Sequence, residues 1–265
     1  MKTRPAIAAG RFYPDNPAEL RKLIELLLSQ AQAPAGPVPK ALIAPHAGYI
    51  YSGPIAASAY ARLLPARETI KRVVLLGPSH YAAFEGLAVS SAEMFATPLG
   101  LVRVDVEAVG KLLALPQVRL LDAAHTREHS LEVQLPFLQV VLKDFALVPL
   151  AVGEASAEQI SRVLELLWGG PETCFVVSSD LSHYLDAAAA RRVDQSTADA
   201  IKALRPASVG EAQACGRIPI LGLLDLAEKH HLQPQVVDLR NSGDTAGPRD
   251  RVVGYGAFVF VESGT

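Results

Sequence analysis

Val73-Val-Leu-Leu-Gly-Pro-Ser-His80 contains the pattern on which most of this sequence is built. Four apolar residues in a row, without alternating polar ones, are typical of a strand that is buried on both faces of a sheet. Gly77 and Pro78 are expected to end this strand, because proline cannot continue a central ladder of hydrogen bonds. His80 is therefore predicted to lie just past the carboxyl end of a buried strand.

The same pattern occurs three more times, and each apolar run leads to side chains that can bind a metal or transfer a proton. The runs and the residues that follow them are Ala41–Ala44 with Pro45 and His46, residues 174–177 with Ser178, Ser179, Asp180 and His183, and Val236-Val237 with Asn241 and Asp244. In open α/β sheets, ligands bind outside the carboxyl ends of the strands. We therefore expect the four exits to converge on one site.

The composition is that of a globular protein without an excess of either charge. Of the 265 residues, 50% are hydrophobic, which is ample for a packed core. The 25 Lys and Arg residues against 27 Asp and Glu residues give a formal net charge of -2. Binding to a phosphate backbone requires a basic excess, so nucleic acid is not an expected partner.

The cysteine content and the apolar runs favour a cytoplasmic setting. Cys174 and Cys215 are too few for a disulfide framework or a CxxC metal site. The first residues contain no apolar segment of secretory length, and no run approaches the roughly 20 apolar residues of a membrane span. We therefore expect a cytoplasmic protein with no membrane partner.

Strands alternate with helices over the whole length, which predicts a single α/β domain over residues 1–265, a three-layer sandwich with a mixed central sheet. Helices are expected at 17–30, 54–64, 105–115, 131–142, 156–168, 187–204 and 218–230, and a loop at 31–39. Strands are expected at 41–44, 73–76, 86–91, 100–104, 146–152, 174–178, 236–239 and 252–261. The strands at 86–91 and 100–104 are predicted to pair with each other, antiparallel, because their connection is short.

His46, His80 and Asp244 are the candidate metal ligands. Two histidines and a carboxylate are the composition of the facial triad that leaves open coordination positions on Fe(II). The alternative is that each histidine only makes structural hydrogen bonds. Asp180 precedes His183 by three residues, so its carboxylate is expected either to orient the imidazole for proton transfer or to belong to a local capping network.

Four further residues are candidates for the neighbourhood of this site. His129 is predicted to form part of the pocket wall or to support a ligand, unless it is a helix-start histidine bonded to backbone. Arg217 is expected to bind a substrate carboxylate or, alternatively, an internal acid. Tyr49 and Tyr51 are expected to be aromatic walls of the pocket, and the alternative is that they are ordinary half-buried packing residues.

Three residues are predicted to play no part in the site. Cys215 is expected to be a packed thiol, Cys174 a core residue and His125 a solvated side chain.

Five motifs carry a resemblance to a known family. They are Ala44-Pro-His-Ala-Gly-Tyr49 with Tyr51-Ser52-Gly53, Leu76-Gly-Pro-Ser-His80, Glu128-His-Ser-Leu-Glu132, Ser178-Ser-Asp-Leu-Ser-His183 and Cys215-Gly-Arg-x-Pro-Ile220. Together they resemble the Memo family, and the match runs nearly end to end. The sequence is similar in particular to the prokaryotic branch of that family, the AmmeMemoRadiSam system protein B group.

The resemblance implies the fold of the class III (LigB-type) extradiol dioxygenases. It matches His46 and His80 to the metal-binding histidines, places Asp244 where the dioxygenases have a glutamate ligand, and makes His183 the acid-base residue. Because eukaryotic members have cysteine as third ligand, their copper chemistry is expected to transfer poorly to an aspartate site. Fe(II) is therefore the expected metal, with Zn(II), Mn(II) or Cu as alternatives.

The function expected on these grounds is a metal-dependent, dioxygenase-like oxidoreductase that acts on a small-molecule substrate. Two alternatives remain at this point: a non-catalytic scaffold that binds a metal or a peptide, and a metal-dependent hydrolase. The family resemblance also implies a partnership with a radical-SAM protein and an AMMECR-type protein.

Overall fold

Four parallel strands form the centre of the molecule. The computed structural model describes residues 1–31 and 36–262. In it, β2 (Ala41–Ala44), β9 (Thr173–Ser178), β3 (Arg72–Pro78) and β8 (Ala146–Val152) lie side by side in that order. Every residue of β2, β8 and β9 is buried, so the prediction that unbroken apolar runs are doubly covered strands is confirmed for these strands. It is wrong for the run Val236-Val237, because Val236 is 37% exposed.

Gly77 and Pro78 end β3 as predicted, but they do so as its last two residues. These two residues continue the strand and pair with Ala151 and Val152 of β8. The ladder tolerates Pro78 at the last position because the next residue, Ser79, supplies a backbone N–H to the Val152 carbonyl at 3.0 Å. His80 still follows directly after the strand.

The sheet extends on both sides of this parallel centre and is mixed, as predicted. Among the described residues its twelve strands run in the order β1-β5-β6-β8-β3-β9-β2-β12-β10, with β11 also pairing β12, β4 pairing β8, and β7 pairing β4. β12 (Val252–Val261) is antiparallel to β2, and β11 (Gln233–Asn241) is antiparallel to β12. The remaining strands are short: β1 (Thr3–Arg4), β4 (Leu87–Val89), β5 (Met94–Thr97), β6 (Gly100–Val104), β7 (Val118–Leu120) and β10 (His183–Leu185).

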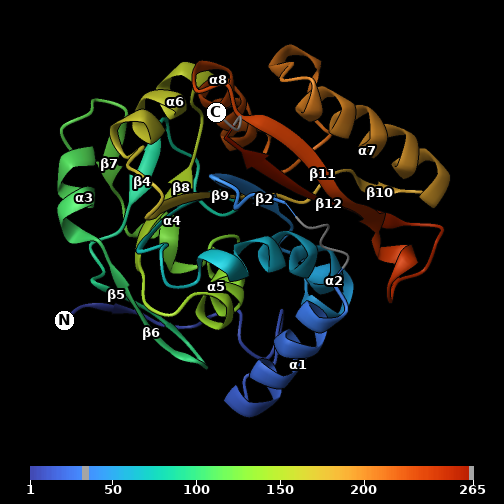
Figure 1. The fold of residues 1–265 in the computed structure, drawn as a ribbon, viewed down its shortest axis with the longest axis horizontal. Helices are drawn as coiled ribbons and strands as arrows, with labels where there is room; N and C mark the ends of the chain where they lie inside the picture. Colours follow the sequence, from blue (N-terminus) through green and yellow to red (C-terminus); the bar gives the residue numbers. More distant parts are fainter. Residues whose placement is uncertain (32–35, 263–265) are drawn as a thin grey trace.

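Helices cover the sheet on two sides, which gives the predicted three layers (Figure 1). One layer contains α6 (Ala157–Leu166), α7 (Ala187–Lys202) and α8 (Arg217–Lys229), and the other contains α1 (Pro17–Ser29), α2 (Tyr49–Tyr60) and α5 (Leu135–Val141). Short elements complete the chain: α3 (Val106–Leu112), α4 (Ala123–Thr126), and the 3-10 turns Ala61–Ala66, Glu132–Gln134, Pro206–Ser208 and Ser242–Asp244. The polar side chains of Asn16, Asp105, Ser156 and Asp186 cap the helices that follow them.

Two local predictions are corrected. α2 begins at Tyr49, five residues before the predicted start, and Pro54 lies inside it. The strand β6 pairs with β5 and not with 86–91, whose strand β4 pairs with β7 and β8. The short alternation in β5 gave no sequence signal of its own. Part of the predicted loop at 31–39 lies outside the described residues.

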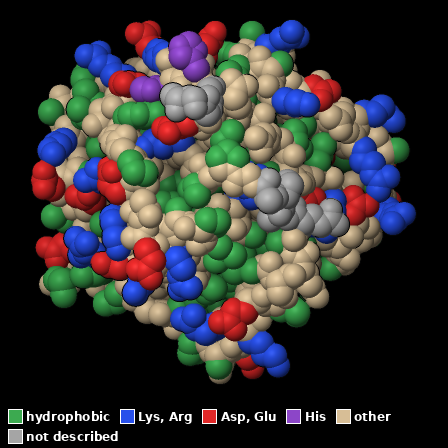
Figure 2. Space-filling view, viewed as in Figure 1, with side chains coloured by type: hydrophobic (Ala, Val, Ile, Leu, Met, Phe, Trp, Pro, Cys, Tyr) green, Lys and Arg blue, Asp and Glu red, His purple; other side chains and the backbone are tan. Residues whose placement is uncertain are grey.

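The surface in Figure 2 carries charges of both signs. Lys and Arg side chains alternate with Asp and Glu side chains around the edge of this face, and hydrophobic side chains gather near its centre. Within residues 1–31 and 36–262, no helix has the length and apolarity needed to cross a membrane.

Candidate metal centre

His46 and His80 meet above the carboxyl ends of the parallel strands. His46 follows β2 and His80 follows β3, and the two strands are separated only by β9. The centroids of the two imidazole rings lie 5.3 Å apart. This edge of the sheet is where α/β proteins bind their ligands, so the predicted convergence of these two strand exits holds.

Cys215 completes a group of three potential ligands. Its Sγ atom lies 3.4 Å from His46 Nε2, and the ligand atoms of His46, His80 and Cys215 all lie within 4.8 Å of one another. The sequence interpretation of Cys215 as a packed thiol missed this position. One imidazole is buried and the other is exposed, so the group combines a fixed interior side with an open one.

The exit of β9 holds Cys215 in place. The backbone N–H of Cys215 donates to the Asp180 carbonyl at 3.2 Å, and the N–H of Gly216 donates to Ser179 Oγ at 2.9 Å. A Cβ atom at position 216 would lie 2.6 Å from Ser179 Cβ. The Cys-Gly pair therefore fits here because only glycine lets the segment come this close to β9.

Ser178 fixes the tautomer of His46. The Ser178 hydroxyl donates its only proton to the Ser130 carbonyl at 2.6 Å and accepts an N–H from Gln134 at 2.7 Å. Its other lone pair faces His46 Nδ1 at 2.8 Å. His46 Nδ1 must therefore carry the proton, which leaves Nε2 with a bare lone pair directed at the side of Cys215.

Glu128 fixes the tautomer of His80. Its Oε1 atom lies 2.9 Å from His80 Nδ1, and its Oε2 atom accepts the backbone N–H of the same histidine at 2.6 Å. A carboxylate that accepts the Nδ1–H of a histidine is the usual support for a metal-binding imidazole. The group therefore offers two bare Nε2 atoms and one thiol, and these residues fit a metal ion.

The electrostatics of the group agree with this fit. Burial, reinforced by His80, lowers the pKa of His46 to about 3, so the ring is neutral at pH 7. Burial opposes ionisation of Glu128, but its hydrogen bonds to His80 and Ser130 and its electrostatic interaction with His80 outweigh burial and lower the pKa of Glu128 to about 2. Burial and nearby Asp180 raise the pKa of the Cys215 thiol to about 12. A metal that binds here must displace that proton.

His129 lies against the two histidines. Its ring stacks on His80 with centroids 4.9 Å apart and on Phe12 with centroids 4.4 Å apart. His129, His80 and Glu128 form a second group whose ligand atoms lie within 4.8 Å of one another. The Glu128 carboxylate is already used by three N–H groups, and His129 Nδ1 is buried without a hydrogen-bond partner. His129 thus packs against the candidate ligands, and its Nδ1 atom makes no hydrogen bond to the backbone.

Asp180 and His183 leave β9 close to the site, but not as a hydrogen-bonded pair. Asp180 Oδ1 accepts the backbone N–H of His46 at 2.8 Å and that of Ala47 at 3.3 Å. Burial raises the pKa of Asp180, and these two N–H groups and nearby His183 partly offset the effect. The carboxylate therefore fixes the segment that carries His46, while His183 lies in β10 within electrostatic range of Asp180 and His46.

The structure does not bring Asp244 into this group. Its Oδ1 atom accepts from Arg191 Nη2 at 2.6 Å, and its Oδ2 atom accepts the backbone N–H of Asn241 at 3.1 Å. The exit of β11 does lie at the predicted edge of the sheet. However, β11 is the second strand beyond β2, which displaces Asp244 by about 10 Å at the usual strand spacing.

The three predicted substrate-binding residues also have other partners or positions. Tyr49 is buried between Tyr13 and Phe137, and its hydroxyl donates to the Val133 carbonyl at 2.7 Å. Arg217 Nε donates to the Val209 carbonyl at 2.8 Å. Tyr51 is 38% exposed and lies in α2.

The prediction that His125 is solvated is wrong. Its side chain is buried, and its Nε2 atom lies 3.0 Å from the Ala88 carbonyl oxygen.

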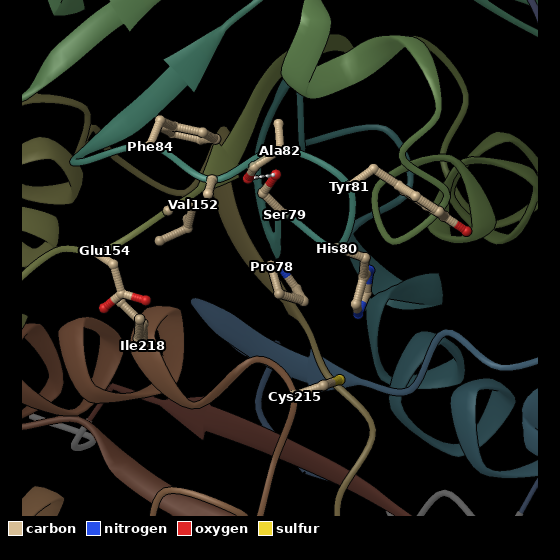
Figure 3. A pocket seen from close by; sticks show the side chains of 12 residues that line it. Pro78, Ser79, His80, Tyr81, Ala82, Phe84, Val152, Glu154, Cys215 and Ile218 are labelled. Carbon is tan, nitrogen blue, oxygen red and sulfur yellow. Dashed lines mark hydrogen bonds between the residues drawn. The ribbon is translucent and has the colours of Figure 1, made fainter.

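A cavity of about 420 Å³ opens beside the ligand group. Figure 3 shows His80 pointing toward Cys215 at one side of this cavity, with Tyr81 above them and Phe84, Glu154 and Ile218 at the opposite side. A ligand that occupied the cavity would therefore reach two of the three potential metal ligands.

These features define a class: α/β proteins with a candidate mononuclear metal centre at the carboxyl edge of a parallel sheet. The family model described as Memo-like protein matches residues 4–259. The chain belongs to this family.

Several relatives match over nearly their full length. A MEMO1 family protein from Aquifex aeolicus is 36% identical over 272 residues, which cover 98% of this chain and 100% of that protein. A MEMO1 family protein from Archaeoglobus fulgidus is 36% identical over 266 residues and covers 95% of this chain and 97% of its own length. Among solved structures, the uncharacterized protein JW3007 from Escherichia coli K12 superposes with a TM-score of 0.54 at 13% identity, covering 83% of this chain and 98% of that one. This last likeness concerns the fold alone.

Replacing Glu128 with Gln is expected to weaken metal binding by about 10- to 100-fold, the usual effect of losing a residue that orients a ligand. The glutamine side chain has only one acceptor oxygen, so the hydrogen bond to either the ring N–H or the backbone N–H of His80 is lost. Competition with a coloured chelator measures the affinity, and Glu85→Gln, on a different surface, is the control. If Glu128→Gln bound metal as tightly as the wild type, Glu128 would not orient a ligand.

Proposed function

We propose that this protein is a metal-dependent oxidoreductase whose single ion is held by His46, His80 and Cys215. One observation carries the proposal: both histidines are tied through Nδ1, to Ser178 and Glu128, so that both Nε2 atoms are free beside the Cys215 sulfur. Structural histidines that merely fill hydrogen bonds have no need of a common orientation toward a thiol.

The proposed metal changes with the ligand set. The case for Fe(II) rested on a carboxylate ligand at Asp244, and that residue is paired with Arg191. Two imidazoles and a thiolate are the trigonal donor set of protein copper sites, and thiolates also favour Zn(II) over harder ions. We therefore propose copper first and Fe(II) second. When bound, such an ion would supply electron transfer and open coordination positions for a substrate.

The chain's own residues would position the substrate and move its protons. His183 is the proposed acid-base group, because it lies near the buried Asp180 and His46 but belongs to neither ligand group. His129, flat against His80 and Phe12, would hold the His80 ring in its orientation. A dioxygenase-like reaction, which the LigB resemblance implies, is the specific form of this proposal.

A metal-dependent hydrolase is the second candidate, because a thiolate and two imidazoles are also a ligand set for catalytic Zn(II). The two functions differ in their need for an oxidant. The protein is loaded with copper, iron or zinc and tested in two assays. Oxygen uptake with catechols and related phenols favours the oxidoreductase if only a redox-active ion gives turnover. Hydrolysis of ester or amide substrates favours the hydrolase if zinc alone supports it.

His183→Ala is expected to keep the metal and lower turnover by about 10²–10⁴-fold, the usual contribution of a positioned acid-base group. His46→Ala should lose both metal and turnover, because it removes a ligand. Elemental analysis and the rate of the substrate found in the screen are measured on the same preparations. Release of the metal by His183→Ala would make His183 a ligand. Full turnover in that variant would remove its acid-base role.

A further inference from the structure

The cavity beside the candidate metal centre has two chemically different ends. His80 and Cys215 form one end. The carboxylate of Glu154 and the apolar side chains of Phe84 and Ile218 lie at the other end, with the apolar side chains of Val152 and Pro78 between the two ends (Figure 3). A molecule bound to the metal would extend along apolar walls toward a negative charge.

Glu154 is not neutralised within the protein. It is exposed, and none of the ion pairs formed by residues 1–31 and 36–262 involves it. The residues that line the cavity include no Lys and no Arg. Arg119 lines a neighbouring cavity that Glu154 also borders, but it forms no ion pair with Glu154.

The backbone under Glu154 is held firmly. Its N–H donates to the Phe84 carbonyl at 2.9 Å, and its carbonyl accepts the N–H of Gly86 at 2.7 Å. A Cβ atom on the preceding Gly153 would lie 2.1 Å from the Phe84 carbonyl oxygen, so the turn is packed as closely as glycine allows. The backbone that carries Glu154 is therefore fixed, and its side chain extends from there to the cavity.

We propose that Glu154 selects substrates with a cationic group, such as a protonated amine, joined by a short apolar segment to the group that binds the metal. This inference rests on the proposed metal centre and adds the substrate class to it. A carboxylate at the edge of a cavity attracts a cation and repels an anion, and a molecule held in the cavity brings its charged end within a few ångströms of that carboxylate. A glutamate distant from the bound molecule would not discriminate between them.

Three hydroxamates that bind the same metal through the same two oxygens test this selection. Aminohexanohydroxamic acid ends in an ammonium group, hexanohydroxamic acid in a methyl group, and the monohydroxamic acid of adipic acid in a carboxylate. Their dissociation constants are measured from the absorption changes of Co(II)-loaded protein whose metal content has been determined. We expect the ammonium compound to bind about tenfold more tightly than the carboxylate compound, with the methyl compound between them.

Glu154→Gln is expected to reduce that tenfold ratio to about one, and Glu154→Lys to reverse it. Glu85→Gln is the matched control, since Glu85 pairs with Glu154 in an isolated bridge but does not line this cavity, and it should keep the wild-type ratio. A ratio near one in the loaded wild type, or an unchanged ratio in Glu154→Gln, overturns the role of Glu154 alone. Failure of the wild type to load metal at all overturns the metal centre and, with it, this inference.

Discussion

Cys215→Ala is expected to lower the affinity for the bound metal by about 10²–10³-fold, because it removes one of the three proposed ligands, which would share the total binding energy of the site. Asp244→Asn should leave the affinity unchanged, since the Asp244 carboxylate is paired with Arg191 and Asn241. Both variants are loaded anaerobically with copper(I), iron(II) or zinc(II), and bound metal is measured after gel filtration by elemental analysis and chelator competition.

The matched control for this variant is Cys174→Ala. Cys174 is buried in β9 and belongs to neither group of potential ligands, so its loss tests whether removing any thiol reduces metal content. We expect Cys174→Ala to bind metal like the wild type at temperatures where it remains folded. The opposite ranking, with metal lost in Asp244→Asn and kept in Cys215→Ala, would restore the carboxylate site that the sequence predicted.

Arg4→Ala is expected to lower the free energy of unfolding by about 3–5 kcal/mol, the cost of leaving one member of a buried ion pair alone. The side chains of Arg4 and Glu132 are 5% and 0% exposed, and they form a salt bridge. Glu132 also accepts the Tyr13 hydroxyl at 2.5 Å and the backbone N–H of Ala8 at 2.8 Å. Removal of Arg4 therefore leaves a buried carboxylate without its cation.

The same substitution is expected to weaken metal binding. Arg4 Nε donates to the His125 carbonyl at 2.9 Å, and Arg4 Nη2 donates to the Glu128 carbonyl. Arg4 therefore holds the segment that carries both Glu128 and His129. Chemical denaturation of the metal-free protein measures the stability, and metal competition measures the effect on the site.

Lys2→Ala is the control for Arg4→Ala. Lys2 forms an ion pair with Asp122, but its side chain is 61% exposed and that of its partner is 41% exposed. Such pairs contribute at most about 1 kcal/mol. Equal losses of stability in the two variants would show that burial does not strengthen the Arg4 network.

The strand pattern could be predicted from sequence because it is local. Each of the central strands is a short run of apolar residues whose neighbours on both sides are turn formers, so Ala41–Ala44 and residues 174–178 needed no knowledge of the rest of the chain. The prediction that His46 and His80 meet also held. It required only that both histidines follow parallel strands, and such strands all end at one edge of the sheet.

The third ligand position could not be predicted in this way. Asp244 and Cys215 are both polar groups next to core elements, and what separates them is the order of strands across the sheet. β11 lies beyond β12, whereas the segment before α8 folds back onto the exit of β9. Neither the order of the strands nor the contact between this segment and β9 produces a periodic pattern in the sequence. The glycine that follows Cys215 was the one local sign that this segment approaches another backbone closely.

The residues that orient the histidines are also non-local. Ser178 and Glu128 are 132 and 48 positions away from the imidazoles that they contact. Tyr49 is a residue that the sequence wrongly suggested for the site. An aromatic residue close to a histidine in sequence resembles a pocket wall, but Tyr49 belongs to the core because α2 begins before the predicted start at Pro54 and turns this side chain inward.

X-ray absorption at the metal edge of the zinc-loaded protein shows whether Cys215 is a ligand, because sulfur and nitrogen ligands lie at different distances from zinc. We expect one sulfur at about 2.3 Å together with nitrogen or oxygen ligands at about 2.0–2.1 Å, and no sulfur in Cys215→Ser. A fully loaded wild-type protein with nitrogen and oxygen ligands only would rule out Cys215 as a ligand.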